Sequence, residues 1–444
     1  MSANQLSVSA VSRTLTWQFK TTSMRSVRYR RGRCYYCTMD NLTHSLVGLA
    51  LGELTHRLLP AEPDAPRASA RRRLLLTGAA LASNFPDLDL VLTALAPPPL
   101  GYLLHHRGHT HTLLYVLPQA LALLAALWLS WPAARALLRT SIPARHGLLA
   151  ATLIGLLLHF GMDALNVYGI HPFAPFDPRW YYGDMIFIVE PVFWLALGTP
   201  LAAHVANRTW RRLLLGLLLA LPALFVVTGH LQWGSLVGLT AVWALAVLLT
   251  RRAGERAALL AGVLLAAGFV LLQGAMAERA RGELRAALRQ SDPAALILDL
   301  PLSAFPANPL CWGMVAVTRE GPDGYRIRRG VLSLAPRITP AANCPSAIGG
   351  VQVAQGAAPV AWAWEERGSV AALRALRSRD CRFDAWLRFA RAPSLAGEMA
   401  TDVRFGPPGA PNFSTLYLAA KQVPTCPPGV PRWGYPRADL LGLP

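Results

Sequence analysis

The sequence predicts a mainly α fold, in which a polytopic helical membrane domain is followed by a small α+β extramembrane domain. First, 53% of the 444 residues are hydrophobic, 15% are charged, and the mean hydropathy is +0.33, which is too apolar for a typical soluble domain. Second, apolar runs alternate with short polar links up to residue 276 and shorten afterwards, where Pro and Gly become more frequent. We therefore expect a membrane domain over residues 39–276 and an extramembrane domain over residues 277–444.

The membrane segments are expected where the apolar runs lie. Several runs are shorter than the roughly 20 residues that a simple membrane-spanning helix needs. We expect the first two to be re-entrant or buried between longer helices. In order, the runs cover residues 42–59, 74–96, 113–131, 147–165, 186–204, 213–227, 233–250 and 257–274.

The first 38 residues differ from the rest of the chain. They contain seven basic residues, no Asp or Glu, and no apolar core of the kind that a signal peptide needs. We expect them to be a basic extension upstream of a native start at Met39, without which the net charge of +19 falls by seven to +12. Cys34 and Cys37 have no second cysteine pair nearby, so the pattern favours neither zinc nor redox chemistry.

The basic residues indicate topology rather than nucleic-acid binding, because they form short clusters between apolar runs and no stripe with interleaved aromatics. Fourteen arginines lie in the alternate links 57–73, 131–146, 206–212 and 251–256, and only Arg107 and Arg179 lie in the opposite links. The positive-inside rule predicts that the arginine-rich links are cytoplasmic. The other links and the C-terminal domain are then expected on the periplasmic side of a bacterial-type inner membrane.

The C-terminal part is expected to contain both strands and a helix. Strands are predicted over residues 296–300, 312–318, 325–334 and 415–419, a turn over 321–324 and a helix over 371–389. Its four cysteines suit disulfides in an oxidising compartment, although any of three pairings, or four free thiols, is compatible with the sequence. They are Cys311, Cys344, Cys381 and Cys426.

Residues of the types that bind divalent metals recur where apolar runs meet loops. His159 and Asp163 are four residues apart, so on a helix both side chains leave the same face and can meet one ion. A polar pair at a helix end explains them equally well. Asp87 and Asp89 could converge on a cation, although a helix N-cap with an acidic first turn would give the same pattern. His44 would complete the shell, or is an interfacial histidine.

Residues 105–111 contain four histidines in seven positions, which packing beside a membrane does not explain. We expect His106 and His111 to bind metal. Gly108 permits a tight backbone there, and Thr110 can donate a hydrogen bond to a ligand. Arg107 is a candidate catalytic residue, because its planar guanidinium matches two oxygens of an anionic group such as phosphate, although it could instead bridge the metal carboxylates.

A second set of catalytic candidates lies in the long link at 166–185 and just inside the segment that follows it. Asp184 and Glu190 are polar residues that could cap the site or bind substrate. The alternative for this link is an ordinary turn with an interfacial aromatic belt, which we favour for Trp180.

The series Asn-Leu-Thr-His at 41–44, Pro-Asp-Leu-Asp at 86–89, His-Arg-Gly-x-Thr-His at 106–111 and His-x-x-x-Asp at 159–163 resembles the YdjM-like (DUF457) family of inner-membrane, metal-dependent hydrolases. The resemblance covers residues 39–194. The order of ligands is more loosely similar to that of zinc-dependent phospholipase C, which hydrolyses phosphoesters with clustered zinc ions. The later His-x-x-x-Glu of that enzyme is not evident here, so a full three-metal site is not expected.

The combined interpretation is a membrane-bound metal-dependent hydrolase that uses metal-activated water on an ester or phosphoester, which a site at the membrane surface suggests is lipid-linked. One or two divalent ions are expected, Zn²⁺ or, if carboxylates dominate, Mn²⁺. The alternative is a non-catalytic metal-binding membrane protein with a structural, sensing or envelope-stress role. Lipid bilayer is the expected partner, nucleic acid is not, and the oligomeric state is left open.

Overall fold

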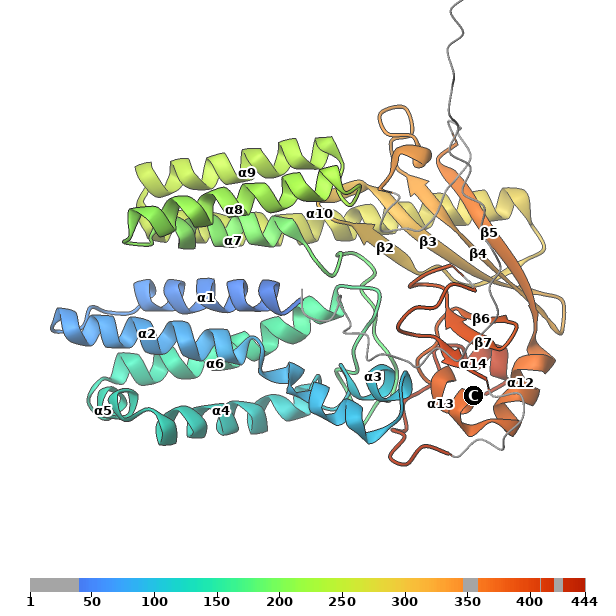
Figure 1. Cartoon of the computed structure of the whole chain (residues 1–444), viewed down its shortest axis with the longest axis horizontal. Helices are drawn as coiled ribbons and strands as arrows, with labels where there is room; N and C mark the ends of the chain where they lie inside the picture. The colour runs from blue at the N-terminus through green and yellow to red at the C-terminus, as the bar shows by residue number, and fades with distance from the viewer. Residues whose placement is uncertain (1–39, 346–357, 408, 419–425, 444) are drawn as a thin grey trace, which may run out of the picture. The chain divides into compact units, whose positions relative to one another are not determined.

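The computed structural model describes residues 40–345, 358–407, 409–418 and 426–443. Helices dominate up to Ser291, and strands follow, which confirms the predicted mainly α fold with a smaller sheet-containing region at its C-terminal end (Figure 1). The basic extension expected at residues 1–38 lies outside the described residues. The domain limits at 39, 276 and 277 stay predictions.

The first group of helices lies around α1 (Asp40–Leu58), α2 (Ala65–Ala82) and α6 (Ile142–Ala164). Asp64 caps α2 by accepting a hydrogen bond from the backbone N–H of Arg67. Two glycines of α1 allow α1 and α2 to approach closely. A Cβ at Gly52 would lie 2.5 Å from the carbonyl oxygen of Leu75, and one at Gly48 would lie 2.7 Å from that of Ala79. The shorter members of the group are η2 (Leu113–Tyr115), α4 (Val116–Ser130) and α5 (Pro132–Thr140).

The run at 74–96 is not one continuous helix. The α2 helix ends at Ala82, and the chain continues as the 3₁₀ helix η1 (Phe85–Leu95) and the short helix α3 (Leu100–His105). Pro86 explains part of this break, because proline cannot donate the backbone hydrogen bond that a continuous α-helix requires. The break places Asp87 and Asp89 on the tighter 3₁₀ turns, and both carboxylates are buried there.

The second group of helices contains α7 (Pro191–Ala203), α8 (Arg208–Val227), α9 (Trp233–Arg252) and α10 (Gly254–Ser291). In the described part of the chain, five helical segments are long and apolar enough to cross a membrane: 113–130, α6, α8, α9 and α10. The α7 helix is shorter and almost wholly buried against its neighbours. The α1 and α2 helices are not among the five, which is compatible with the expectation that the first segments are not simple spans.

The helices alternate in direction, so that the links between them collect at two ends. The four arginine-rich links lie at the left-hand end of the helices in Figure 1, and the C-terminal sheets lie at the opposite end. This distribution is the one that the alternating arginine content predicts. The link 166–190 and the segments η1 and α3 lie at the same end as the sheets.

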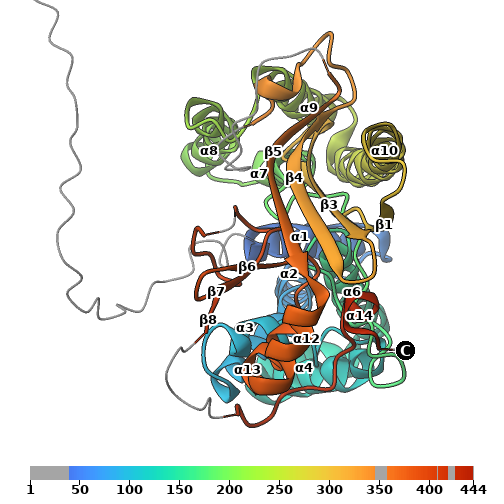
Figure 2. The same ribbon diagram turned by 90° about the vertical axis from the view of Figure 1, so that its right-hand side faces the viewer.

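The C-terminal part contains two antiparallel sheets. In the larger sheet, the order is β1 (Leu296–Asp299), β3 (Asn308–Glu320), β4 (Gly324–Ser333) and β5 (Val360–Ser369), and β2 (Leu302–Phe305) also pairs with β3 (Figure 2). The predicted turn joins β3 to β4, where Glu320 pairs with Gly324. The smaller sheet consists of β6 (Pro393–Ala396), β7 (Met399–Asp402) and β8 (Leu416–Tyr417).

Short helices and two disulfides complete this part. The helix expected over 371–389 is divided into α12 (Val370–Arg379) and α13 (Cys381–Leu387), because Asp380 leaves the helical conformation and caps α13. The remaining helices are η3 (Ala341–Asn343) and α14 (Ala438–Leu441). Cys311 pairs with Cys344, and Cys381 with Cys426, which selects one of the pairings that the sequence left open.

The C-terminal part packs directly onto the end of the helices that carries η1 and α3. The indole N–H of Trp433 donates to the carbonyl oxygen of Leu104 at 2.7 Å, and the guanidinium of Arg391 lies 2.9 Å from Asp184. One cluster of buried apolar side chains contains residues of α3, the 166–190 link and the C-terminal segments. The C-terminal part therefore packs over the end of the helices where the predicted metal ligands lie.

Candidate metal centre

The last turns of α6 contribute two of the candidate ligands. Ser141 caps the start of this helix, and Leu165 follows its end. His159 and Asp163 are one turn apart, as their spacing predicts, and both side chains are buried. Nδ1 of His159 lies 2.8 Å from the carbonyl oxygen of Ser83, which leaves Nε2 directed away from that carbonyl. Nε2 lies 3.6 Å from Oδ2 of Asp163.

Asp87 approaches the same point from η1. Its Oδ1 atom lies 3.4 Å from Nε2 of His159 and 3.6 Å from Nε2 of His111. The side-chain amide of Asn41 donates to the other oxygen of Asp87 at 3.1 Å. The break between α2 and η1 is therefore what brings this carboxylate to the end of α6.

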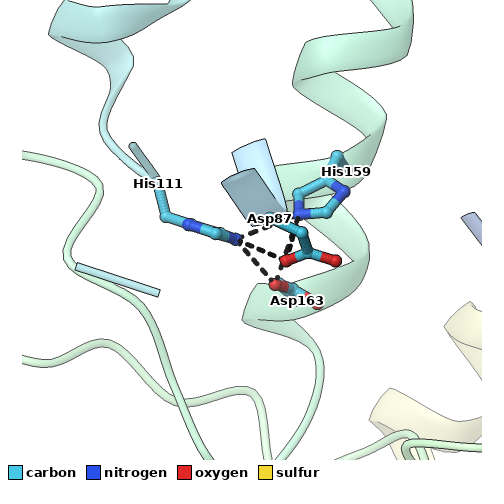
Figure 3. A group of neighbouring side chains, drawn as sticks. All are labelled: Asp87, His111, His159 and Asp163. Carbon is cyan, nitrogen blue, oxygen red and sulfur yellow. Dashed lines mark hydrogen bonds and ion pairs between the residues drawn. The ribbon is translucent and has the colours of Figure 1, made fainter. Parts of the chain in front are cut away.

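His111 closes the group from the loop after α3. Its Nε2 atom lies 3.0 Å from Nε2 of His159 and 3.1 Å from Oδ2 of Asp163. One ligand atom from each of Asp87, His111, His159 and Asp163 lies within 4.8 Å of the other three, and all four side chains are buried (Figure 3). Two imidazole nitrogens and two carboxylates that converge in this way form a donor set suited to a divalent ion.

The charge of the surroundings also fits a divalent cation. In the metal-bound state, where the histidines would be neutral ligands, the buried carboxylates of Asp87, Asp89 and Asp163 carry three negative charges, and the buried guanidinium of Arg107 carries one positive charge. The remaining two negative charges would be costly in a buried site. One divalent cation would balance them. The four converging residues and the local charge therefore both fit a metal ion.

Asp89 holds His111 and the loop around it. One oxygen of Asp89 accepts hydrogen bonds from the backbone N–H of Arg107 and from the hydroxyl of Thr110, both at 2.9 Å, and lies 3.1 Å from Nδ1 of His111. The other oxygen lies 3.0 Å from Nδ1 of His106. A carboxylate on the far nitrogen of a ligating histidine fixes its tautomer and raises its basicity. This is the arrangement at His111.

The two other predicted ligands, His106 and His44, have different positions. Asp87, Asp89 and His106 form a second group of converging ligand atoms, which shares Asp87 with the first. His44 stacks on His159 with 4.0 Å between ring centroids, and its Nε2 atom lies 3.4 Å from Oδ1 of Asp163. The structure thus brings all seven predicted ligand residues together around α6 and η1.

Arg107 lies directly beside the four-residue group. Its guanidinium is buried, lies 2.9 Å from Oδ1 of Asp163 and donates to the side chain of Asn166 at 3.0 Å. The ring of Tyr168 lies 5.2 Å from the guanidinium carbon. The backbone of Arg107 has a φ of 59°, which is unfavourable for a residue with a side chain. This strained conformation coincides with the backbone donation to Asp89.

The surroundings of the η1 carboxylates, Asp87 and Asp89, favour their charged forms. Burial opposes ionisation of Asp87, but the neighbouring imidazoles of His111 and His159 hold its pKa well below the usual range. Burial likewise opposes ionisation of Asp89, whose pKa is lowered by His111 and His106. For His111, burial disfavours the charged form, but the carboxylates of Asp89, Asp163 and Asp87 raise its pKa well above the ordinary value. Asp87 and Asp89 are therefore ionised, as carboxylate ligands of a cation must be.

The structure does not bring Asp184 and Glu190 into the group. Asp184 forms ion pairs with Arg391 at 2.9 Å and Arg281 at 3.3 Å. Glu190 caps α7 and accepts backbone hydrogen bonds from Val192 and Ala307. These contacts join the helices to the C-terminal part, and the catalytic role expected of the two carboxylates stays a prediction.

Sequence reasoning did not identify three partners of the site. Asn41, Ser83 and Asn166 hold Asp87, His159 and Arg107 respectively. Asn41 is the first residue of the Asn-Leu-Thr-His motif at 41–44, so the motif itself is a signal for its role. Ser83 acts through its backbone, and Asn166 lies distant in sequence from its partner, so no local pattern marks either. Two further histidines, His105 and His109, contact each other, with 3.1 Å between Nδ1 of His105 and Nε2 of His109.

The comparison with known families agrees with this geometry. Residues 39–236 match the YdjM inner membrane protein family. The resemblance inferred from the four motifs is thereby confirmed over this stretch, which contains all the residues of the candidate metal centre. Together with the five membrane-capable helices, the YdjM match identifies the chain as a membrane protein.

One curated relative from Bacillus subtilis (strain 168), the uncharacterized protein YfhP, is 28% identical over 172 residues. That alignment covers 36% of this chain and 48% of YfhP, so the chain spans about half the length of this relative. No solved structure matches the chain significantly.

Proposed function

We propose that the chain is a membrane-bound metal-dependent hydrolase that acts on an ester or phosphoester. The observation that carries this proposal is the position of Arg107, whose buried guanidinium lies 2.9 Å from Asp163, one of the four converging ligand residues. A hydrolytic site uses such a cation to stabilise the negative charge that develops on the substrate.

The donor set favours Zn²⁺, because imidazole nitrogens and carboxylate oxygens in a four-ligand group suit that ion, and Mn²⁺ is the alternative if further carboxylates participate. When bound, the ion would lower the pKa of a coordinated water toward neutrality and polarise the bond under attack. Asp87, His111, His159 and Asp163 would hold it. The group Asp87, Asp89 and His106 is the candidate for a second ion.

The residues around these ligands have separate tasks in this proposal. Asp89 and the carbonyl of Ser83 fix the orientation of His111 and His159, so that the Nε2 atom of each ring faces the centre. Arg107 is the catalytic residue that would bind the substrate oxyanion, and Asn166 keeps its guanidinium in place. His44 would support the site by stacking on His159.

The substrate class follows from the location of the centre. The ligands lie at the end of α6, a membrane-capable helix, and at the end of the helices opposite the arginine-rich links. By the positive-inside rule this end faces the periplasm of an inner-membrane protein. A site at that level would reach the head group of a lipid, so we favour a lipid-linked ester or phosphoester.

The test is a hydrolysis screen with purified protein in detergent. Phosphomonoesters, phosphodiesters and carboxyl esters of lipids are offered to the metal-depleted and the metal-reloaded protein. We expect turnover only after reloading, and its loss in H159N but not in H146N, which changes an exposed histidine of the same helix. Turnover of every substrate at the same rate after chelation would contradict the proposal.

One observation favours a second candidate function, a structural or sensing metal centre. All four converging ligands are protein side chains and are buried, and a site closed by four protein ligands is typical of structural zinc. X-ray absorption spectroscopy of the reloaded protein separates the two. A coordinated water supports the hydrolase, and a shell of protein ligands alone supports the structural centre.

A further inference from the structure

A second site lies where α10 leaves its apolar segment. A pocket of about 330 Å³ is bordered by one face of α10 and by the first strand of the large sheet. Figure 2 shows β1 next to α10. The side chains around the pocket are those of Arg281, Arg285, Arg289, Ile297, Leu298, Asp299 and Leu300.

The arginines are four residues apart, so they form a single stripe along the helix. Arg281 is held by ion pairs with Asp184 and Glu278. Arg285 and Arg289 are exposed and form no ion pair or hydrogen bond with any described residue. Two guanidiniums therefore face the pocket with their donors available to a ligand.

Among the described residues that border the pocket, Asp299 is the only carboxylate, and it is already neutralised. Both of its oxygens accept from Arg391, at 2.7 and 3.0 Å, and Arg437 lies 3.5 Å away. It cannot serve as a counter-ion for Arg285 and Arg289 without losing these partners. The pocket is thus positively charged, and the N–H donors of Arg285 and Arg289 are available to the oxygens of an anionic ligand.

The position along α10 indicates which anion would reach it. The apolar part of α10 ends near Met276. Of the two available arginines, Arg285 is the nearer, nine residues later or about 14 Å farther along the helix axis. Side chains of a helix point back toward its N-terminus, so the long arginine side chain extends from there toward the level of the lipid phosphates just above the hydrocarbon core. The apolar side chains of Ile297, Leu298 and Leu300 on the opposite wall suit the glycerol and first acyl carbons of a lipid.

We propose that the Arg281–Arg285–Arg289 pocket binds the phosphate group of an anionic phospholipid. The site is independent of the metal centre, because none of its lining residues is a candidate metal ligand. It would anchor the C-terminal part at the membrane surface through Arg285 and Arg289. Arg281 would position the stripe through its contact with Asp184.

The test compares the wild-type full chain with three double variants. R285Q/R289Q removes the two available guanidiniums, and R279Q/R337Q removes the same charge from exposed arginines outside the pocket. R285K/R289K keeps the charge but replaces each planar guanidinium, which can donate two parallel hydrogen bonds, by an ammonium group. Each form is placed in phosphatidylcholine nanodiscs with or without dioleoyl phosphatidylglycerol, and bound lipid is measured by native mass spectrometry.

We expect R285Q/R289Q to retain about tenfold less phosphatidylglycerol than the wild type, R279Q/R337Q to match the wild type, and R285K/R289K to lie between. Equal retention in R285Q/R289Q and R279Q/R337Q would overturn the proposal. Inorganic phosphate is the second probe. Saturable phosphate binding without preferential retention of phosphatidylglycerol would show that the pocket takes a soluble anion, which overturns the lipid assignment. Metal content measured in the same samples reports on the metal centre separately.

Discussion

Oδ2 of Asp89 lies 3.1 Å from Nδ1 of His111. This contact directs the opposite nitrogen of the ring toward Asp163 and His159, so that Asp89 sets the geometry of the four-residue group from outside it. The pair is the kind of carboxylate–histidine contact that orients a metal ligand and increases its basicity. It also explains why the Pro-Asp-Leu-Asp motif contains two carboxylates, of which one faces the group and one supports it.

The first prediction concerns D89N, which preserves the shape of the side chain and removes its charge. We expect metal affinity to fall about 10- to 100-fold, because His111 loses the charged partner of its far nitrogen. Competition with a chromogenic chelator measures the affinity. D177N is the matched control, because Asp177 lies in a loop and pairs with Arg179. If D89N and D177N bind metal equally well, the orienting role of Asp89 is wrong.

The second prediction concerns pH. The surrounding carboxylates raise the pKa of His111 well above its usual value, so the metal-free protein holds a proton there at neutral pH. An incoming ion must displace this proton, and affinity therefore increases with pH, by up to about tenfold per unit for one proton. Calorimetry in two buffers of different ionisation enthalpy measures the proton release. An affinity that is constant between about pH 6 and pH 8, without proton release, would contradict this account.

The third prediction concerns Arg107. R107Q is expected to reduce turnover of the ester found in the screen by about 100-fold or more while metal is retained, because the cation that receives the oxyanion is lost. R107K should restore part of the rate, since a charge returns without the planar fork. The control is R179Q, at an exposed arginine of the neighbouring loop. Steady-state kinetics with metal analysis distinguish the outcomes, and an unchanged kcat in R107Q would remove Arg107 from the mechanism.

The fourth prediction concerns topology. A phosphatase reporter fused after residue 444 should be active in the periplasm, and Cys381 and Cys426 should react with a thiol reagent only after reduction. The same is expected of Cys311 and Cys344. Activity of a cytoplasmic reporter at this position, together with thiols that react without reduction, would reverse the orientation.

The sequence was most informative where spacing and chemistry act together. The pair His159 and Asp163 shares a helix face because of the four-residue spacing, and the dense histidine loop lies beside it. Arginine content separated the two sets of links that Figure 1 shows at opposite ends of the helices. These features depend on local periodicity and charge, which the sequence displays directly.

Other features depend on contacts between distant segments. The end of α2 at Ala82 and the 3₁₀ form of η1 were not evident in a continuous apolar run, although Pro86 marks the position. Asp184 and Glu190 were predicted beside the site because they are polar residues near a membrane, whereas their partners come from α10 and the C-terminal part. The strand β5 was also missed, because charged residues interrupt its apolar pattern.

The most direct test of the central claim is the metal content of the protein purified from Met39 onward. Elemental analysis should find about one divalent ion per chain in the wild type and in H146N, and a strongly reduced amount in H159N, because Nε2 of His159 belongs to the converging set. A protein that folds normally but contains no divalent metal, and takes up none when zinc or manganese is supplied, would contradict the account.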